Sequence, residues 1–320
     1  MWRRGAPCIC VGRNYIDIII ILSIIFSKTE INMQQVYNID IQQARVAYDC
    51  SPDGRYDHWC LLRDGDKPKH VGNFSAYSPA YVSSNEQVAD IIKWLNPAGK
   101  TALAIAGSGD MPIFLSAYGA AHVDTFDVSY NARVIMDVKT HMLMQGVHYW
   151  DYISTLRDLK SAPDILNCKS TETLFNAVTS QTAQYLRAMH GCKIFLHSEC
   201  GEIAYLPTQA EYAAMRQNVR TWYDFIWTDL FSLSGQISGQ KYDIIYLSNV
   251  LQYVMVEKDI LDVLNGLRDN LNPGGIIVVD ALLSMYSSVR RKRYESVSEK
   301  ISWAEMIYHQ PARTMFLKAR

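Results

Sequence analysis

The residues best suited to chemistry lie in one stretch, where a glycine turn follows a short apolar run and an aspartate ends the next strand-like run. Gly107-Ser108-Gly109-Asp110 comes directly after the apolar run 101–106, and Asp127 follows the strand-like run 122–126. Glycine lets the backbone turn sharply and lets a ligand approach the main chain. Asp127 follows Gly109 at close to the spacing of about 20 residues at which an acid binds a ribose. The pattern predicts the first half of a nucleotide-binding, doubly wound sheet.

This turn differs from a pyrophosphate-binding turn. A dinucleotide site has a third glycine where this chain has Pro112, and the carboxylate of Asp110 repels a phosphate. The same carboxylate suits a ligand with an ammonium or sulfonium group, and S-adenosylmethionine carries both and no phosphate. We therefore expect the four turn residues and Asp127 to bind S-adenosylmethionine. A structural turn without a ligand is the alternative.

Composition narrows the function classes. The chain has 320 residues, enough for one large domain or two small ones. Its net charge of −1 does not indicate a broad basic surface for binding nucleic acid. Its seven cysteines show no paired spacing and indicate reduced thiols of a cytoplasmic protein. Cys192, His197 and Cys200 lack the second half of a metal site, and no metal is expected.

Residues 1–32 differ in composition from the rest of the chain. The segment IDIIIILSIIF is almost purely apolar, but its dozen or so residues fall short of the about 20 that span a bilayer. We expect either a weak membrane anchor or translated sequence upstream of a start at Met33, and favour the second. The remaining domain would then be 33–320.

Two segments could surround the ligand. Ser84-x-x-Gln87 predicts a capping box that opens a helix ending at Leu95, so that Tyr81, Asn85 and Glu86 either line the mouth of the site or simply cap the helix. A mainly helical insertion at about 146–220, with helices expected at 149–159, 171–189 and 209–221, is long enough to build an acceptor pocket or lid. A structural cap is the alternative.

The sheet resumes after the insertion. Strands are expected at 222–227, 242–247 and 276–279, with a helix at 259–270 and a terminal antiparallel hairpin of 303–308 and 313–317. Alternating strands and helices imply a parallel sheet covered on both faces. Asp229, at the end of one strand, is placed to meet an adenine amino group. Ser248, Asn249 and Tyr253, just after another, are the candidate catalytic residues, because acceptors often dock there.

One dense basic run, Arg290-Arg291-Lys292-Arg293, occurs near the C-terminus. We interpret it as a solvated helix face; the alternative is weak contact with an anionic membrane surface.

The order of several motifs resembles that of one family, the bacterial diacylglycerol 3-amino-3-carboxypropyltransferases of betaine-lipid synthesis and their uncharacterised relatives, within the class I methyltransferase superfamily. The motifs are Tyr81-Val82-Ser83-Ser84-Asn85-Glu86, the 107–110 turn, Gly119-Ala120-Ala121, Phe126-Asp127, Thr228-Asp229-Leu230 and the run from Tyr242 to Asn249. The resemblance covers roughly residues 77–317. It implies that Gly107, Gly109, Asp110, Asp127 and Asp229 hold S-adenosylmethionine. It departs at Ser129-Tyr130, where family members often have Asn-Pro.

The expected fold is therefore an α/β, doubly wound, mostly parallel sheet with a helical insertion. The expected function is transfer of the 3-amino-3-carboxypropyl group of S-adenosylmethionine to an unidentified small-molecule or lipid acceptor. The alternatives are a methyltransferase and a non-catalytic protein that senses S-adenosylmethionine. A nicotinamide-dependent oxidoreductase is disfavoured by Pro112 and Asp110.

Overall fold

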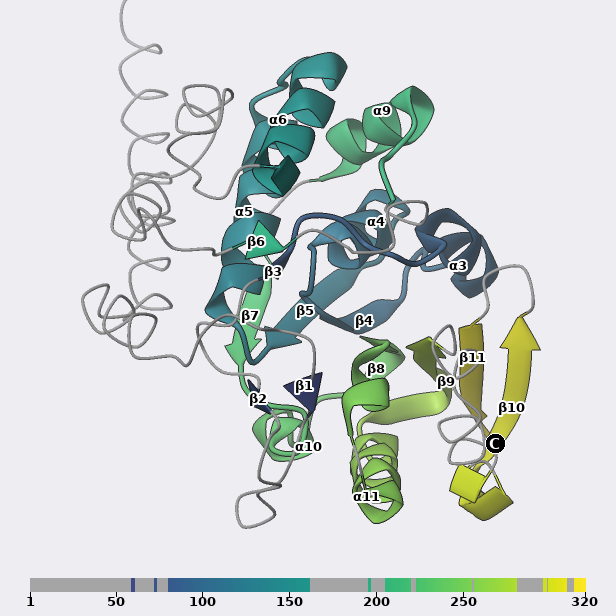
Figure 1. Cartoon of the computed structure of the whole chain (residues 1–320). Helices are drawn as coiled ribbons and strands as arrows, with labels where there is room; N and C mark the ends of the chain where they lie inside the picture. The colour runs from purple at the N-terminus through teal and green to yellow at the C-terminus, as the bar shows by residue number, and fades with distance from the viewer. Residues whose placement is uncertain are drawn as a thin grey trace, which may run out of the picture. The chain divides into compact units, whose positions relative to one another are not determined.

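The computed structural model describes residues 59–60, 72–73, 80–161, 195–196, 205–219, 223–254, 256–280, 296–297, 299–309 and 314–320 (Figure 1). All of them belong to one compact unit, Ala44–Arg320. The predictions for residues 1–32, for the expected helix at 171–189, for the basic run 290–293 and for the cluster of Cys192, His197 and Cys200 lie outside the described residues and stay predictions.

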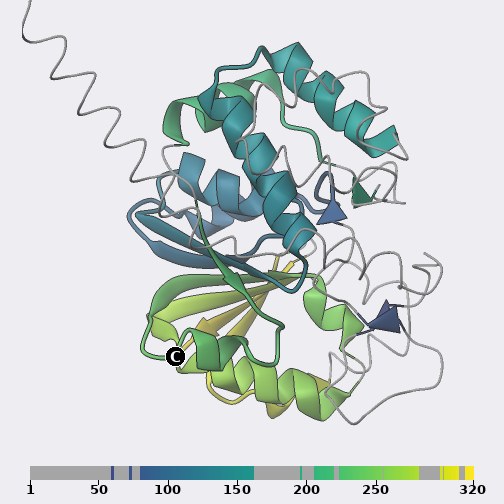
Figure 2. The same cartoon turned by 90° about the vertical axis from the view of Figure 1, so that its left-hand side faces the viewer.

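A seven-stranded sheet forms the centre of this unit (Figure 1 and Figure 2). In order across the sheet, the strands are β10 (Ala304–His309), β11 (Thr314–Ala319), β9 (Leu271–Asp280), β8 (Tyr242–Ser248), β4 (Thr101–Ile105), β5 (His122–Asp127) and β7 (Asp224–Trp227). Neighbouring strands from β9 to β7 are parallel, and β11 is antiparallel to both β9 and β10. The predicted fold class is confirmed, because this is a doubly wound, mostly parallel sheet with the antiparallel hairpin β10–β11 at one edge, an arrangement typical of class I methyltransferases.

The central strands are apolar because both faces of the sheet are covered. In β4 the side chains of Ala102, Leu103 and Ala104 are fully buried, and in β8 the buried run extends from Ile244 to Leu247. Helices α4 and α5 cover one face, and α10 and α11 cover the other (Figure 1 and Figure 2). The described helices are α3 (Val88–Leu95), α4 (Asp110–Ala117), α5 (Tyr130–Met144), α6 (Tyr149–Ser161), α9 (Gln209–Asn218), α10 (Leu233–Gln236), α11 (Glu257–Arg268) and the 3₁₀ helix η3 (Val250–Tyr253).

The predicted capping box at Ser84 is wrong. Helix α3 begins only at Val88, and its N-cap, Gln87, makes no side-chain capping bond. Ser84 is held elsewhere: its amide donates to Asp110 Oδ2 at 2.7 Å, while its Oγ accepts from the Glu86 amide at 3.1 Å. These bonds keep residues 82–87 as an irregular loop, because they compete with a helical first turn.

The described part of the insertion contains two helices, α6 and α9, and one short strand, β6 (Phe195–Leu196). Helix α6 follows α5, and α9 packs on α4 and α5. A capping box does open α9, with Thr208 Oγ1 accepting from the Glu211 amide at 3.3 Å and Glu211 Oε2 accepting from the Thr208 amide at 2.7 Å. Two short parallel pairs complete the described elements: β1 (Trp59–Cys60) with β2 (Gly72–Asn73), and β3 (Ala80–Tyr81) with β6.

Across the described part of the chain, the helices are all too short or too polar to traverse a lipid bilayer.

Removing the aromatic stack between α3 and β11 should destabilise the fold. Trp94 lies on the fully buried Phe316, with ring centroids 3.7 Å apart and planes 20° from parallel. We expect Trp94→Ala to lower the free energy of unfolding by roughly 3 kcal/mol, measured by urea denaturation. Trp150→Ala is the matched control, because Trp150 is 60% exposed and its loss should cost less than about 0.5 kcal/mol. Equal losses in the two variants would show that α3 does not depend on this stack.

Candidate functional site

A pocket opens at the carboxyl ends of β4, β5 and β8, where the order of strands in the sheet reverses direction. Ligands of doubly wound folds bind in this crevice. The pocket encloses about 910 Å³ of empty space, which includes open solvent at its mouth. Its lining combines apolar side chains with hydroxyl and amide groups, and includes Tyr81, Ser83, Ser84, Asn85, Gly107, Ser108, Asp127, Ser129, Thr228, Ser248, Asn249 and Tyr253.

The glycine turn joins β4 to α4, and its two glycines have different roles. Both have left-handed backbones, with φ of 50° at Gly107 and 78° at Gly109. A β-carbon on Gly109 would lie 2.8 Å from the Cα of Met136, so this residue must be glycine for α5 to pack against the turn. A β-carbon on Gly107 would meet no atom within 4 Å, and Gly107 lines the pocket. Gly107 and Ser108 are therefore the turn residues that a ligand can approach.

Asp127 lies at the end of β5, as predicted, and its carboxylate is fixed in position. Oδ2 accepts from the Gly107 amide at 2.9 Å and Oδ1 from the Ser129 amide at 2.8 Å. Burial raises the pKa of Asp127 to about 6, although these amides partly offset the effect. The side chain is 7% exposed and lines the pocket. A group held in this way can accept hydrogen bonds from a ligand without further ordering.

Asp110 is behind the pocket wall rather than on it. Its Oδ1 forms an ion pair with Lys139 Nζ of α5 at 2.5 Å, and its Oδ2 accepts from Ser84 N and from Ser108 Oγ at 2.9 Å. Both charged side chains are almost completely buried. Burial lowers the pKa of Lys139, and the neighbouring Asp110 partly offsets this. The sequence did not single out Lys139, which lies 29 residues from its partner.

The carboxylate of Asp229 is hydrogen-bonded to residues of its own loop. Its Oδ1 accepts from the amides of Phe231 and Ser232 at 2.8 and 2.9 Å, and its Oδ2 from the Ser232 hydroxyl. The neighbouring residues Thr228 and Leu230 line the pocket, whereas Asp229 and Gly109 do not. The loop that follows β7 therefore contributes to the pocket lining through Thr228 and Leu230, the two neighbours of the predicted residue Asp229.

The predicted catalytic residues Ser248, Asn249 and Tyr253 come together on one side of the pocket, at the end of β8 and in η3. Ser248 has a left-handed backbone with φ of 56°, which is uncommon for serine and is often found at functional sites. Its Oγ donates to Glu86 Oε1 at 2.7 Å, and the Tyr246 hydroxyl donates to Glu86 Oε2. Glu86 is 3% exposed, so a buried carboxylate lies directly behind Ser248.

Tyr81 and Asn85 belong to the segment from β3 to α3, and both line the pocket. The Tyr205 amide, from the returning end of the insertion, donates to the Ser84 carbonyl at 2.6 Å. The ring of Tyr205 packs edge-on against Phe114 of α4. The insertion thus supports the loop that forms this part of the lining.

Comparisons with known proteins give similarity of fold alone. No protein-family model and no curated protein matches the sequence. Similar solved structures include the N-methyltransferase NodS of Bradyrhizobium japonicum with S-adenosyl-L-homocysteine (11% identity, 73% of this chain, 85% of that chain, TM-score 0.34). The rRNA methyltransferase AviRa of Streptomyces viridochromogenes has 11% identity, coverage of 76% and 86%, and a TM-score of 0.39. The precorrin 8W decarboxylase of Methanobacterium thermoautotrophicum has 10% identity, coverage of 73% and 88%, and a TM-score of 0.34. Likenesses this distant say nothing about the ligand or reaction of this chain.

Removing one partner of the buried ion pair between Asp110 and Lys139 should destabilise the fold more than replacing both partners together. We expect Lys139→Met to lower the free energy of unfolding by about 3–5 kcal/mol, because it leaves the charge of Asp110 buried without its partner. In the double variant Lys139→Met/Asp110→Asn, much of this loss should be recovered, since the asparagine oxygen can still accept from Ser84 N. Chemical denaturation of both single variants and the double variant gives the coupling energy. Additive losses would contradict a direct pair.

Proposed function

We propose that the protein is an S-adenosylmethionine-dependent transferase whose cofactor binds at the carboxyl ends of β4, β5 and β8. The observation that carries this proposal is the charge of the pocket. Asp127 is the one ionisable acid among its described lining residues, and no lysine, arginine or histidine is among them. A phosphate-bearing nucleotide would meet no cation in such a pocket, whereas a nucleoside with a sulfonium and an ammonium group is attracted by a carboxylate.

In this proposal, the cofactor's ribose lies against Asp127, and its adenine enters the part of the pocket lined by Phe126, Thr228 and Leu230. The methionine part extends along Gly107 and Ser108 towards Tyr81 and Asn85, which offer a hydroxyl and an amide to its carboxylate. Asp110 acts from behind: by holding the Ser84 amide and the Ser108 hydroxyl, it positions the loop and the turn on either side of that part.

For the group that is transferred, we favour 3-amino-3-carboxypropyl. The two motifs on which the family resemblance depends are in direct contact, because Ser84 N donates to Asp110 Oδ2. In this reaction, a nucleophilic atom of the acceptor bonds to the γ-carbon. The bond from that carbon to sulfur breaks, and sulfur keeps the electron pair in methylthioadenosine. The acceptor's proton has a path through the Ser248 hydroxyl to the buried Glu86. Positioning supplies most of the catalysis in such a step.

The acceptor is a small molecule or lipid with a nucleophilic oxygen or nitrogen. Ser248, Asn249 and Tyr253 supply hydroxyl and amide groups at the end of β8, which β4 separates from the strand of Asp127, and they form the acceptor end in this proposal. Methyl transfer is the second candidate, because the strand order is that of class I methyltransferases. The two reactions differ only in which carbon faces the acceptor.

Replacing Asp127 should weaken cofactor binding in a pH-dependent way. For Asp127→Asn we expect a loss of about 1.5–3 kcal/mol, since a charge-assisted hydrogen bond to the ribose is removed. Because the pKa of Asp127 is about 6, the affinity of the unmodified protein should also fall as the pH drops from 8 through 6 to 5. The variant should show no such fall. Calorimetry with S-adenosylmethionine and with NAD measures both effects, and Asp269→Asn on the exposed end of α11 is the control. Tight NAD binding without S-adenosylmethionine binding would contradict the proposal.

The nucleoside by-product distinguishes the two reactions. The protein is incubated with S-adenosylmethionine and a cell extract that supplies acceptors, and the nucleosides are resolved by mass spectrometry. We expect methylthioadenosine, at a rate that falls in Asp127→Asn. S-adenosylhomocysteine alone would replace the proposal with methyl transfer. Cofactor binding with neither product above background would favour a sensing protein.

A further inference from the structure

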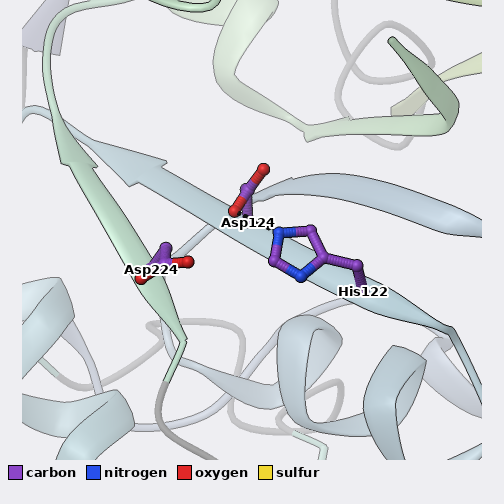
Figure 3. Close-up of side chains that lie close together, drawn as sticks. All are labelled: His122, Asp124 and Asp224. Carbon is purple, nitrogen blue, oxygen red and sulfur yellow. Dashed lines mark hydrogen bonds and ion pairs between the residues drawn. The ribbon is translucent and has the colours of Figure 1, made fainter. Parts of the chain in front are cut away.

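We propose that His122, Asp124 and Asp224 form a binding site for a divalent metal ion at the amino ends of β5 and β7. One ligand atom from each residue lies within 4.8 Å of the other two. Figure 3 shows the three side chains directed towards one another, two from β5 and one from the neighbouring strand β7. This group is at the opposite end of these strands from the pocket, and it is independent of the proposed transfer reaction.

The register of the sheet brings the two carboxylates together. Asp124 and Asp224 are direct partners in the parallel pairing of β5 with β7, so their side chains leave the same face of the sheet side by side. His122 precedes Asp124 by two residues and shares that face. Like charges directly opposite each other on neighbouring strands destabilise a sheet. Within the described part of the chain, no lysine or arginine forms an ion pair with either aspartate.

A second layer of hydrogen bonding fixes the buried ligand. Asp124 is 8% exposed; its Oδ2 accepts from the Tyr242 hydroxyl at 2.8 Å, and its Oδ1 lies 2.7 Å from His122 Nε2. Tyr242 is itself 2% exposed and projects from the first residue of β8. Metal-binding carboxylates commonly have such a partner, which orients the free oxygen towards the ion. Asp124 Oδ1, which is now hydrogen-bonded to His122, is therefore the oxygen placed for coordination, and an ion would replace this hydrogen bond.

The ligand set indicates which ions fit. One imidazole nitrogen and two carboxylate oxygens suit borderline and hard divalent ions such as Zn²⁺ and Mn²⁺, and the absence of a thiolate from the set disfavours soft ions. His122 and Asp224 are exposed, so an ion can enter from solvent and keep water in its remaining positions. The role that this position allows is structural: the ion would join the edge strand β7 to β5 and remove the repulsion between their carboxylates.

The test uses Mn²⁺ and Zn²⁺ on the full chain. Mn²⁺ is titrated by the loss of its free electron paramagnetic resonance signal, and Zn²⁺ by calorimetry. We expect one ion per chain, and at least about tenfold weaker binding in both His122→Ala and Asp224→Asn, since the first removes the ligand nitrogen and the second replaces an anionic carboxylate by a neutral amide. Tyr242→Phe should weaken binding about 10–100-fold by releasing Asp124. The matched controls His148→Ala and Asp151→Asn alter exposed residues of the same types outside the group, and should bind as the unmodified protein does.

Melting temperatures give a second readout. Without metal, Asp224→Asn should melt at a higher temperature than the unmodified chain, because one of two facing carboxylates is gone. With saturating metal, the order should reverse, because binding stabilises only the chain with the complete ligand set. Either of two results would overturn the proposal: no saturable binding of either ion, or equal affinity in the unmodified chain and in both ligand variants.

Discussion

The buried ion pair between Asp110 and Lys139 is the interaction on which the geometry of the pocket depends. It joins the first residue of α4 to the middle of α5 beneath the glycine turn. The remaining oxygen of Asp110 holds the Ser84 amide and the Ser108 hydroxyl. Two buried charges are tolerated only when each is paired and hydrogen-bonded, so this arrangement allows few alternatives. It thereby fixes two parts of the pocket lining, the loop at Ser84 and the glycine turn, relative to each other.

Much of the fold could be predicted from sequence because its signals are local. Strands β4, β5 and β8 lie within a residue or so of the predicted bounds, and the glycine turn and the end of β5 are where the spacing placed them. The order of the edge strands also agrees, since a short connection between two strands favours a hairpin. The start of α3 was wrong because a long-range bond to Asp110 outweighs the local capping signal at Ser84.

The site was less predictable, because the partners of its charged residues come from distant parts of the chain. In the sequence, Lys139 is one more charged residue of a predicted helix. Only the fold shows that its ammonium group contacts Asp110. The position of Glu86 behind Ser248 likewise depends on a contact across 162 residues. Sequence alone identified the segments around the pocket, but not which of their side chains line it and which support it from behind.

The burial of Asp127 places a carboxylate in the pocket but lowers the stability of the folded chain at neutral pH. Because burial raises its pKa from the value of a free aspartate to about 6, the folded chain binds a proton more readily than the unfolded chain between about pH 4 and 6. This contribution to stability is therefore lost as the pH rises through that window. At neutral pH the charge is buried, and its hydrogen-bonding partners among the described residues are backbone amides. A sheet selected for stability alone would not place a carboxylate there. Its position fits the proposed role, because the amides of Gly107 and Ser129 hold the carboxylate in place before a ligand arrives.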